Sequence, residues 1–566
     1  MGFELVATFE SYPTFGPFSI PDQLADESFT VYDHPKVMIF KKSADFSLEQ
    51  VRAILESADL TQILNQSPMA VTIMPTGLRL PPDRLAAQKS GGTWHQMFDF
   101  QSFLNQNQVF GVLAWYLILL LLGWLVFPLV YVACRGLPDR GYPLARLIAL
   151  LFVAWVAWML GSLKILPFTQ GSLGLSVGAL ALIGGYLAVR NRTALTTFVR
   201  ARWRYLLGVE VLFLALFLFD LAVRLGNPDL WHPWLGGEKP MEFAFFNSVL
   251  KAVYFPPENP WFAGNYVNYY YYGYVIAAVL TKLLGIVPSI AFNLVLPTWF
   301  AMTGVGAFCV TCNLVSRTSS SERGVENEEA APSSVAHSRL PYLAGVVAVI
   351  LMLVLGNLYQ VRQLWQYLPQ VSEPGQTNLS APERMVAVIS GASQVLSGQA
   401  QLPGDKGRWY FGASRPILHD KPDTPIAEFP FFSFLYADLH PHVLAMPILF
   451  AALAWILGIL FAPGGKRAWS ERIAMWFVAG LVFGAIRPTH TWDLPTLLGL
   501  GVLALVWKVW RAEGVTPKAL LLMAGQVALL VGVAVVMYYP FAQWFGTEYT
   551  SLELWKGART PLVDYL

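Results

Sequence analysis

Two glutamates four residues apart have the spacing of an acid–base or metal-binding pair. Glu238 and Glu242 lie in the stretch NPDLWHPWLGGEKPMEFAFFNSVL, residues 227–250. Pro240 suits the first turn of a helix, and a helix N-terminus favours a nearby carboxylate in its ionised form. The two carboxylates could therefore converge on one metal ion or on one substrate hydroxyl, with Glu238 or Glu242 as general base. A capped, solvated helix at the membrane surface explains the same spacing.

A second polar stretch brings one carboxylate and two imidazoles close together. EFPFFSFLYADLHPHVLAMP, residues 428–447, contains Asp438, His440 and His442. Carboxylate and neutral imidazole are ligands for a divalent cation, and they also form acid–base pairs. These three residues are the predicted ligands of Mg²⁺ or Mn²⁺. A single DxHxH motif is weakly specific, because Pro441 bends the chain.

Four consecutive tyrosines stand at the start of an apolar run, in NYYYYGYV. Tyrosine favours the interface between lipid and water, so an aromatic belt explains their position. The alternative is that the rings cover a site for a lipid-linked substrate. Four consecutive helical residues cannot all face one way, so at least one hydroxyl should point toward polar groups or the protein interior.

Other polar side chains near the ends of apolar runs could bind a substrate. Arg415, in RWYFGASRPI, could hold a phosphate through its guanidinium fork. The stretch RPTHTWDLP, residues 487–495, offers groups that either contact substrate or brace neighbouring loops. The predicted substrate-binding residues are Lys239, Tyr269, Tyr270, Tyr271, Tyr272, Arg415, Arg487, His490 and Asp493.

The elements that must position these residues are membrane helices. Of the 566 residues, 55% are hydrophobic and 13% are charged, about half of the ~25% charged residues of soluble domains. A helix needs about 20 apolar residues to cross a bilayer. Eleven apolar runs lie at 109–133, 145–166, 172–189, 205–225, 270–287, 290–315, 341–358, 435–461, 473–486, 494–509 and 519–539. We predict an all-α polytopic membrane protein with about 11–12 transmembrane helices. A net charge of +2 gives no reason to invoke nucleic acid.

The chain divides into four predicted segments. Residues 1–108 read as a small α/β segment, with strand signals in SFTVYDHPKVMIFKK and a helix capped by Ser47. Residues 109–204 form three linking helices, and residues 205–566 form the main membrane domain. The polar stretch 316–340 is predicted to be a disordered linker. No signal peptide opens the chain, although residues 1–108 are expected outside the cytoplasm, so we expect a piece of a longer protein.

The distribution of Lys and Arg indicates the orientation. The loop after the first run holds Arg135, Arg140 and Arg146, and the loop after the third run is also rich in arginine. Both loops should be cytoplasmic, so residues 1–108 and 226–268 lie outside. Basic loops further on place 359–434 outside too. Three full spans between 226–268 and 359–434 contradict this, so either one run within 270–315 does not cross or a crossing is missed.

At these residues the chain resembles a family of uncharacterised multispanning proteins named for a tyrosine-rich motif, the YYY-domain (Chlor_Arch_YYY) family. The matching stretches are NPDLWHPWLGGEKPMEFAF, PWFAGNYVNYYYYGY, EFPFFSFLYADLHPH and THTWDLPT, within residues 205–566. Residues 1–45 resemble the exported tail that follows a glycosyltransferase module, which implies an upstream module or subunit as partner. The arrangement also resembles the GT-C superfamily of membrane glycosyltransferases. That resemblance implies a polyprenyl-phosphate sugar donor, often a divalent metal, and an acidic motif at the position of Glu238 and Glu242.

Three functions stay open from the sequence. The first is a glycosyltransferase that acts at the extracytoplasmic face of the cell membrane. The second is a transporter or flippase of a lipid-linked or anionic solute, which would require charged residues near the middle of the bilayer. The third is a non-catalytic subunit of a membrane assembly.

Overall fold

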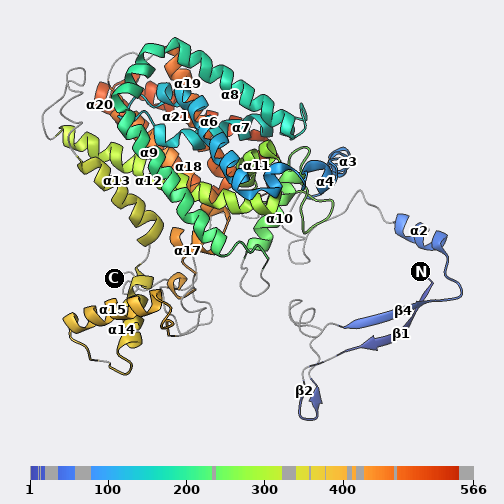
Figure 1. Ribbon diagram of the computed structural model, residues 1–566. Coiled ribbons are helices and arrows are strands. Elements are labelled where there is room, and N and C mark those ends of the chain that lie inside the picture. The colour runs from blue at the N-terminus through green and yellow to red at the C-terminus, as the bar shows by residue number, and fades with distance from the viewer. Residues whose placement is uncertain are drawn as a thin grey trace. The chain divides into compact units, whose positions relative to one another are not determined.

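The computed structural model describes residues 2–10, 12, 14–19, 36–57, 78–231, 238–321, 339–355, 358–376, 378–403, 411–415, 426–463 and 468–546 (Figure 1). The chain separates into two compact units, Met1–Gly77 and Leu78–Leu566. The boundary precedes the predicted one at residue 108, because residues 78–106 bind to the membrane unit. Gln88 is buried there and donates to the carbonyls of Tyr254 and Pro256, at 2.6 and 3.1 Å.

The first unit is a small mixed segment. Strand β1 (Phe3–Phe9) pairs antiparallel with β4 (Val37–Lys42), and β2 (Thr14–Phe15) pairs with β3 (Phe18–Ser19). Helix α2 (Leu48–Glu56) begins at Ser47, whose hydroxyl accepts the N–H of Gln50 as predicted. The second predicted strand is β4, but its partner is the distant β1, and residues 28–35 lie outside the described residues.

The second unit is a helical membrane protein, which confirms the predicted fold class. Nine of its described helices are long and apolar enough to cross a membrane. They are α6 (Gln108–Ala133), α7 (Ala145–Ser162), α8 (Gln170–Arg190), α9 (Arg192–Gly226), α12 (Pro288–Ser321), α18 (Pro441–Phe461), α19 (Trp469–Thr489), α20 (Leu494–Glu513) and α21 (Pro517–Met537). The apolar windows of α12 and α21 are 89% and 17% buried, so α12 is central and α21 peripheral. α12 packs against α9, α13 and α18 (Figure 1).

Shorter elements complete the unit. The shorter apolar helix α13 (Leu340–Ile350) continues into η5 (Leu351–Leu355). The remaining elements are α3 (Pro82–Lys89), α4 (Trp94–Met97), α5 (Phe103–Gln106), η2 (Tyr142–Leu144), α10 (Lys239–Lys251), α11 (Tyr272–Leu284), α14 (Tyr359–Ser372), α15 (Ala381–Leu396), η6 (Gly412–Ser414), α17 (Pro430–Tyr436), η7 (Thr491–Asp493) and α22 (Tyr539–Trp544). Of the predicted linker 316–340, residues 316–321 continue α12, and residues 322–338 lie outside the described residues.

We call the end of the bundle that carries residues 238–271 the site end, and the end that carries residues 134–141 the opposite end. Helix α11 both begins and ends at the site end. It follows Tyr269, which contacts His440 at the start of α18, and beyond it Val287 N donates to Asn105 Oδ1, just before α6, at 2.9 Å. Its 13 residues extend about 20 Å, short of the ~30 Å of hydrocarbon.

A helix whose two ends both lie at the site end accounts for the conflict in the predicted number of crossings. With α11 not crossing, α12 and α13 with η5 are the only described helices that cross between residues 226–268 and 359–434. Two crossings place both segments at the same end. Of the two alternatives, the short length of α11 favours a non-crossing run within 270–315 over a missed crossing.

Candidate active site

Helix α10 places the two glutamates at its N-terminus. Pro240 occupies the first turn, as predicted, and Phe246 and Val249 anchor the helix in the core. Glu242 lies on this buried face and its side chain is 0% exposed, whereas the Glu238 side chain, one residue before the helix, is 59% exposed.

The start of α18 brings the predicted imidazoles to these glutamates. Helix α17 ends at Tyr436 and is followed by Ala437, which adopts a left-handed conformation with φ 62°. This turn directs the chain through an extended segment to His440, the residue before α18. A left-handed residue commonly terminates a helix by allowing its N–H to bond back to the last turn, as Ala437 N does with Phe434 O at 3.1 Å.

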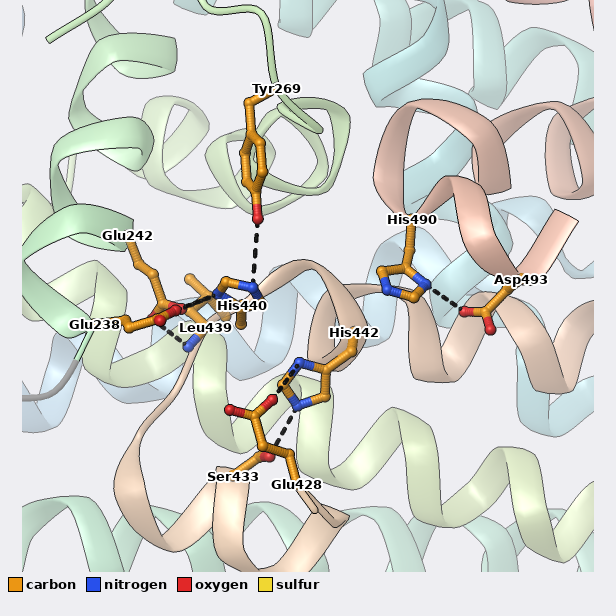
Figure 2. A network of polar contacts seen from close by, with 10 residues as sticks. All are labelled: Glu238, Glu242, Tyr269, Glu428, Ser433, Leu439, His440, His442, His490 and Asp493. Carbon is orange, nitrogen blue, oxygen red and sulfur yellow. Dashed lines mark hydrogen bonds and ion pairs between the residues drawn. The ribbon is translucent and has the colours of Figure 1, made fainter. Parts of the chain in front are cut away.

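His440 joins both glutamates. Its Nδ1 lies 2.9 Å from Glu238 Oε2 and 3.0 Å from Glu242 Oε1 (Figure 2). The N–H of Leu439 donates to Glu242 Oε2 at 2.7 Å. Two segments about 200 residues apart therefore meet at one cluster, as the sequence suggested. We call Glu238, Glu242 and His440 the first group.

Burial decides the protonation of Glu242. The sequence favoured an ionised carboxylate because of the helix N-terminus. In the structure, burial raises the pKa of Glu242 to about 7, and the hydrogen bonds with Asp438 and Leu439 N oppose this only in part. Desolvation of a buried carboxylate outweighs the helix dipole here, so Glu242 holds its proton more tightly than the sequence analysis expected.

A second group lies beside the first. Glu428 Oε2 is 3.5 Å from His442 Nδ1, and Ser433 Oγ is 2.9 Å from His442 Nε2 (Figure 2). Glu428, Asp438 and His442, which we call the second group, each offer a ligand atom within 4.8 Å of the others. The rings of His440 and His442 have centroids 5.6 Å apart. Sequence reasoning did not select Glu428 or Ser433, although Glu428 opens the stretch that holds the DxHxH motif.

Asp438 contacts both groups, and one of its carboxyl oxygens has no hydrogen-bond partner. It is 4% exposed, its Oδ1 has no hydrogen-bond partner, and its carboxyl hydrogen-bonds with Glu242. Burial, followed by the charge of Glu242, holds the pKa of Asp438 well above its usual value. A buried polar atom without a partner costs free energy unless something else satisfies it.

Only two of the four tyrosines face the site. The hydroxyl of Tyr269 lies 3.3 Å from His440 Nε2, and the ring of Tyr270 is 6.2 Å from that of His490. Tyr271 stacks on Phe255 in the core, and Tyr272 packs against Trp158 and Tyr538. The structure therefore places Tyr271 and Tyr272 in the core, away from the two groups, and their predicted role in substrate binding stays a prediction. Both are buried, because α11 begins at Tyr272 and turns these rings into the bundle.

The other predicted residues surround the two groups. His490 Nδ1 pairs with Asp493 Oδ2 at 2.8 Å, which fits the bracing alternative, and Thr491 Oγ1 donates to the carbonyl of Arg487. The Arg415 guanidinium hydrogen-bonds with Ser414 Oγ, and its charge lowers the pKa of Glu428 against the larger effect of burial. The Lys239 ammonium is buried, 5.5 Å from the centroid of the Tyr436 ring. His232 and Arg408, which belong to the quoted stretches around Glu238 and Arg415, lie outside the described residues.

Comparison with known proteins places this site within one family. The model of a family described as uncharacterized membrane proteins, DUF2298, matches residues 152–566, which include every residue of both groups. No curated protein and no solved structure matches the chain. Since the family model covers well over half of the chain, this protein belongs to the DUF2298 family of uncharacterised membrane proteins.

Proposed function

We propose that the protein is a GT-C-like membrane glycosyltransferase that moves a sugar from a polyprenyl-phosphate donor to an acceptor hydroxyl at the site end. The observation that carries the proposal is the first group. Glu238 is an exposed carboxylate, held 2.9 Å from His440 Nδ1, next to a buried second carboxyl. A positioned carboxylate that accepts a proton from an attacking hydroxyl contributes about 10²–10⁴-fold in rate.

In the proposed reaction the acceptor oxygen attacks the anomeric carbon of the donor. Its proton moves to Glu238, and the bond from the anomeric carbon to the phosphate oxygen breaks, with the electron pair staying on the phosphate. The products are the glycosylated acceptor and polyprenyl phosphate. Glu238 takes the proton rather than Glu242, because Glu242 is fully buried and its oxygens face Leu439 N and His440. Glu242 instead positions the imidazole.

The leaving phosphate needs positive charge. Arg415 and Lys239 are the protein cations that we assign to it. The second group suits a divalent cation, since Asp438 Oδ1 is buried without a partner and Ser433 holds the far nitrogen of His442. Glu428, Asp438 and His442 would hold the ion, which would supply further charge to the departing phosphate.

The lipid part of the donor would remain in the bilayer. η5 packs on α17, which leads directly into the site. On the adjoining outer face, Leu343, Val347 and Leu351 are exposed apolar side chains of α13 and η5. This face supports lateral entry of a prenyl chain. Arginines in the opposite-end loops, such as Arg135 and Arg140, support an extracytoplasmic site end by the positive-inside rule.

Sugar transfer by the full chain in lipid nanodiscs tests the proposal. Radiolabelled polyprenyl-phosphate hexoses are supplied with candidate acceptors, and the wild type is compared with Glu238→Gln. The matched control is Asp83→Asn, which also alters an exposed carboxylate that pairs with a cation, Lys164. We expect transfer by the wild type and the control, and its loss in Glu238→Gln. Movement of the lipid-linked sugar across the bilayer without transfer would favour the transporter and end this proposal.

A further inference from the structure

We infer that a pocket at the opposite end of the bundle binds one anionic phospholipid, with the phosphate at Arg472 and Lys508 and an acyl chain between the helices. The pocket has a volume of about 660 Å³. By the positive-inside rule we assign this end to the cytoplasmic leaflet. The inference goes beyond the proposed function and uses no step of the reaction, so either can fail while the other stands.

The pocket lies where four membrane helices have their ends. Helix α18 ends at Phe461 and α19 begins at Trp469, whereas α20 ends at Glu513 and α21 begins at Pro517. Helix α21 packs on α19 and α20, and both of these pack on α18 (Figure 1). A pocket between such ends reaches from the level of the lipid headgroups into the hydrocarbon.

The part of the pocket that reaches into the membrane is apolar. Its walls are formed by Leu521, Leu522 and Leu529 of α21, Met475 and Trp476 of α19, and Leu505 of α20. From Leu521 to Leu529 the pocket follows α21 for about 12 Å. Gly525 lies midway along this wall, and a Cβ atom built there would meet no atom within 4 Å. An elongated apolar space of this kind suits an extended acyl chain better than a compact soluble anion.

Two cationic side chains line the part of the pocket near the helix ends. The exposed Arg472 lies in the first turn of α19. Lys508 Nζ donates to the carbonyls of Ile459 and Ala462, at the end of α18, at 2.6 and 3.2 Å. A guanidinium group binds phosphate oxygens through two parallel hydrogen bonds, and an ammonium group adds a point charge.

The balance of charge selects the headgroup. Among the described residues that line the pocket, Glu513 is the only acidic one, and it pairs with Lys518 at 3.1 Å. The lining therefore keeps a positive charge, which suits a headgroup with a net negative charge. A zwitterionic headgroup would bring its own ammonium beside Arg472 and Lys508. Basic pockets between membrane helices at the cytoplasmic side are typical sites for anionic lipids.

Lipid binding by the full chain tests the inference. Delipidated protein in mild detergent is titrated with dioleoylphosphatidylglycerol or dioleoylphosphatidylcholine, and native mass spectrometry measures the number and the affinity of the bound lipids. Each Lys or Arg near the membrane surface strengthens binding of an anionic lipid about fivefold. We therefore expect one phosphatidylglycerol to bind about 25-fold more tightly than phosphatidylcholine.

Two variants test the two parts of the pocket separately. Gly525→Phe fills the apolar part, so binding of phosphatidylglycerol should be lost. Arg472→Gln should weaken this binding about fivefold. The matched control for the first variant is Gly532→Phe, because Gly532 also faces open space on α21 but does not line the pocket. The control for the second is Arg200→Gln, which removes an exposed arginine of α9 outside the pocket. Both controls should bind as the wild type does.

Three results would overturn the inference. Equal affinities of the wild type for the two lipids would mean that the pocket does not recognise the headgroup. Unchanged binding of phosphatidylglycerol by Gly525→Phe would mean that the lipid binds elsewhere. Excess glycerol phosphate, which has the phosphate but no acyl chain, should displace no lipid, and displacement would mean that the site takes a free phosphate. These measurements leave Glu238 and sugar transfer untouched.

Discussion

Each end of the bundle buries an aspartate, but the two are satisfied differently. At the opposite end, Asp139 Oδ1 accepts the N–H of Gly141 at 2.8 Å, and Oδ2 accepts the hydroxyl of Tyr205 at 2.8 Å and the thiol of Cys309 at 3.3 Å. At the site end, Asp438 is equally buried and its Oδ1 has no partner. A saturated carboxylate ties helices together, whereas an unsaturated one retains capacity for a ligand.

The two ends of the bundle also differ in how their charged side chains are paired. At the opposite end, Glu210 accepts hydrogen bonds from Arg146 and from the hydroxyl of Tyr142, so one anion meets one cation. Among the described residues of the two groups at the site end, carboxyl groups gather around histidines instead. Burial raises the pKa of both Glu242 and Asp438, which is costly to a fold and therefore points to binding rather than to support.

Replacing Glu238 should have the largest effect on activity. It should also distinguish the role of the site end from that of the opposite end most clearly. Glu238→Gln removes the proposed proton acceptor, so we expect sugar transfer to fall by about 10²–10⁴-fold. Thermal stability should hardly change, because the side chain is mostly exposed. Transfer is measured in nanodiscs and stability by intrinsic fluorescence on the same preparation. Unchanged transfer would mean that Glu238 only belongs to a capped, solvated helix at the membrane surface and takes no part in the reaction.

Asp139→Ala should lower stability and leave the transfer rate unchanged, which is the reverse of the outcome expected for Glu238→Gln. It leaves the N–H of Gly141 and the hydroxyl of Tyr205 buried without their acceptor, which costs about 3 kcal/mol of stability. The folded fraction should transfer sugar at the wild-type rate per molecule. Thermal unfolding in detergent measures the loss, and Asp83→Ala, an exposed carboxylate, should show none. A reduced transfer rate in fully folded Asp139→Ala would mean that the opposite end also serves the reaction.

Much of the fold was predictable because it depends on apolar runs. The long runs became helices, and Pro240 marked the first turn of α10. The conflict in span parity pointed to a non-crossing segment within 270–315 or to a missed crossing, and that range contains α11. The DxHxH stretch and the two glutamates could be expected to meet because both lie at the same ends of apolar runs.

The rest depended on contacts that the local sequence does not encode. Tyr269 and Tyr272 are identical residues three positions apart, yet one faces His440 and the other Trp158, because neighbouring helices decide which ring is enclosed. The protonation of Glu242 follows from burial by distant segments. The attachment of residues 78–106 to the membrane unit depends on Gln88 finding the carbonyls near Tyr254.

The pH dependence of stability should distinguish the site end in metal-free protein. Burial raises the pKa of Glu242 to about 7 from its usual 4.5. The folded state therefore binds more protons at Glu242 than the unfolded chain does between these values. The contribution of Glu242 to stability is thus greatest below pH ~4.5 and falls as the pH rises to ~7, by up to about 3 kcal/mol. In Glu242→Gln this component should vanish. Parallel melting curves for both proteins across this range would show that Glu242 is not the group responsible.

The smallest expected effect lies within the tyrosine run itself. Tyr269→Phe removes a hydroxyl 3.3 Å from His440 Nε2 but keeps the ring. One neutral hydrogen bond is worth about 1 kcal/mol, so transfer should fall about fivefold. Tyr272→Phe removes a hydroxyl whose contact, Tyr538, lies 3.4 Å away inside the core, and transfer should not change. Equal losses in both variants would mean that the run acts as one packed unit, and that proximity to His440 does not separate site residues from supporting ones.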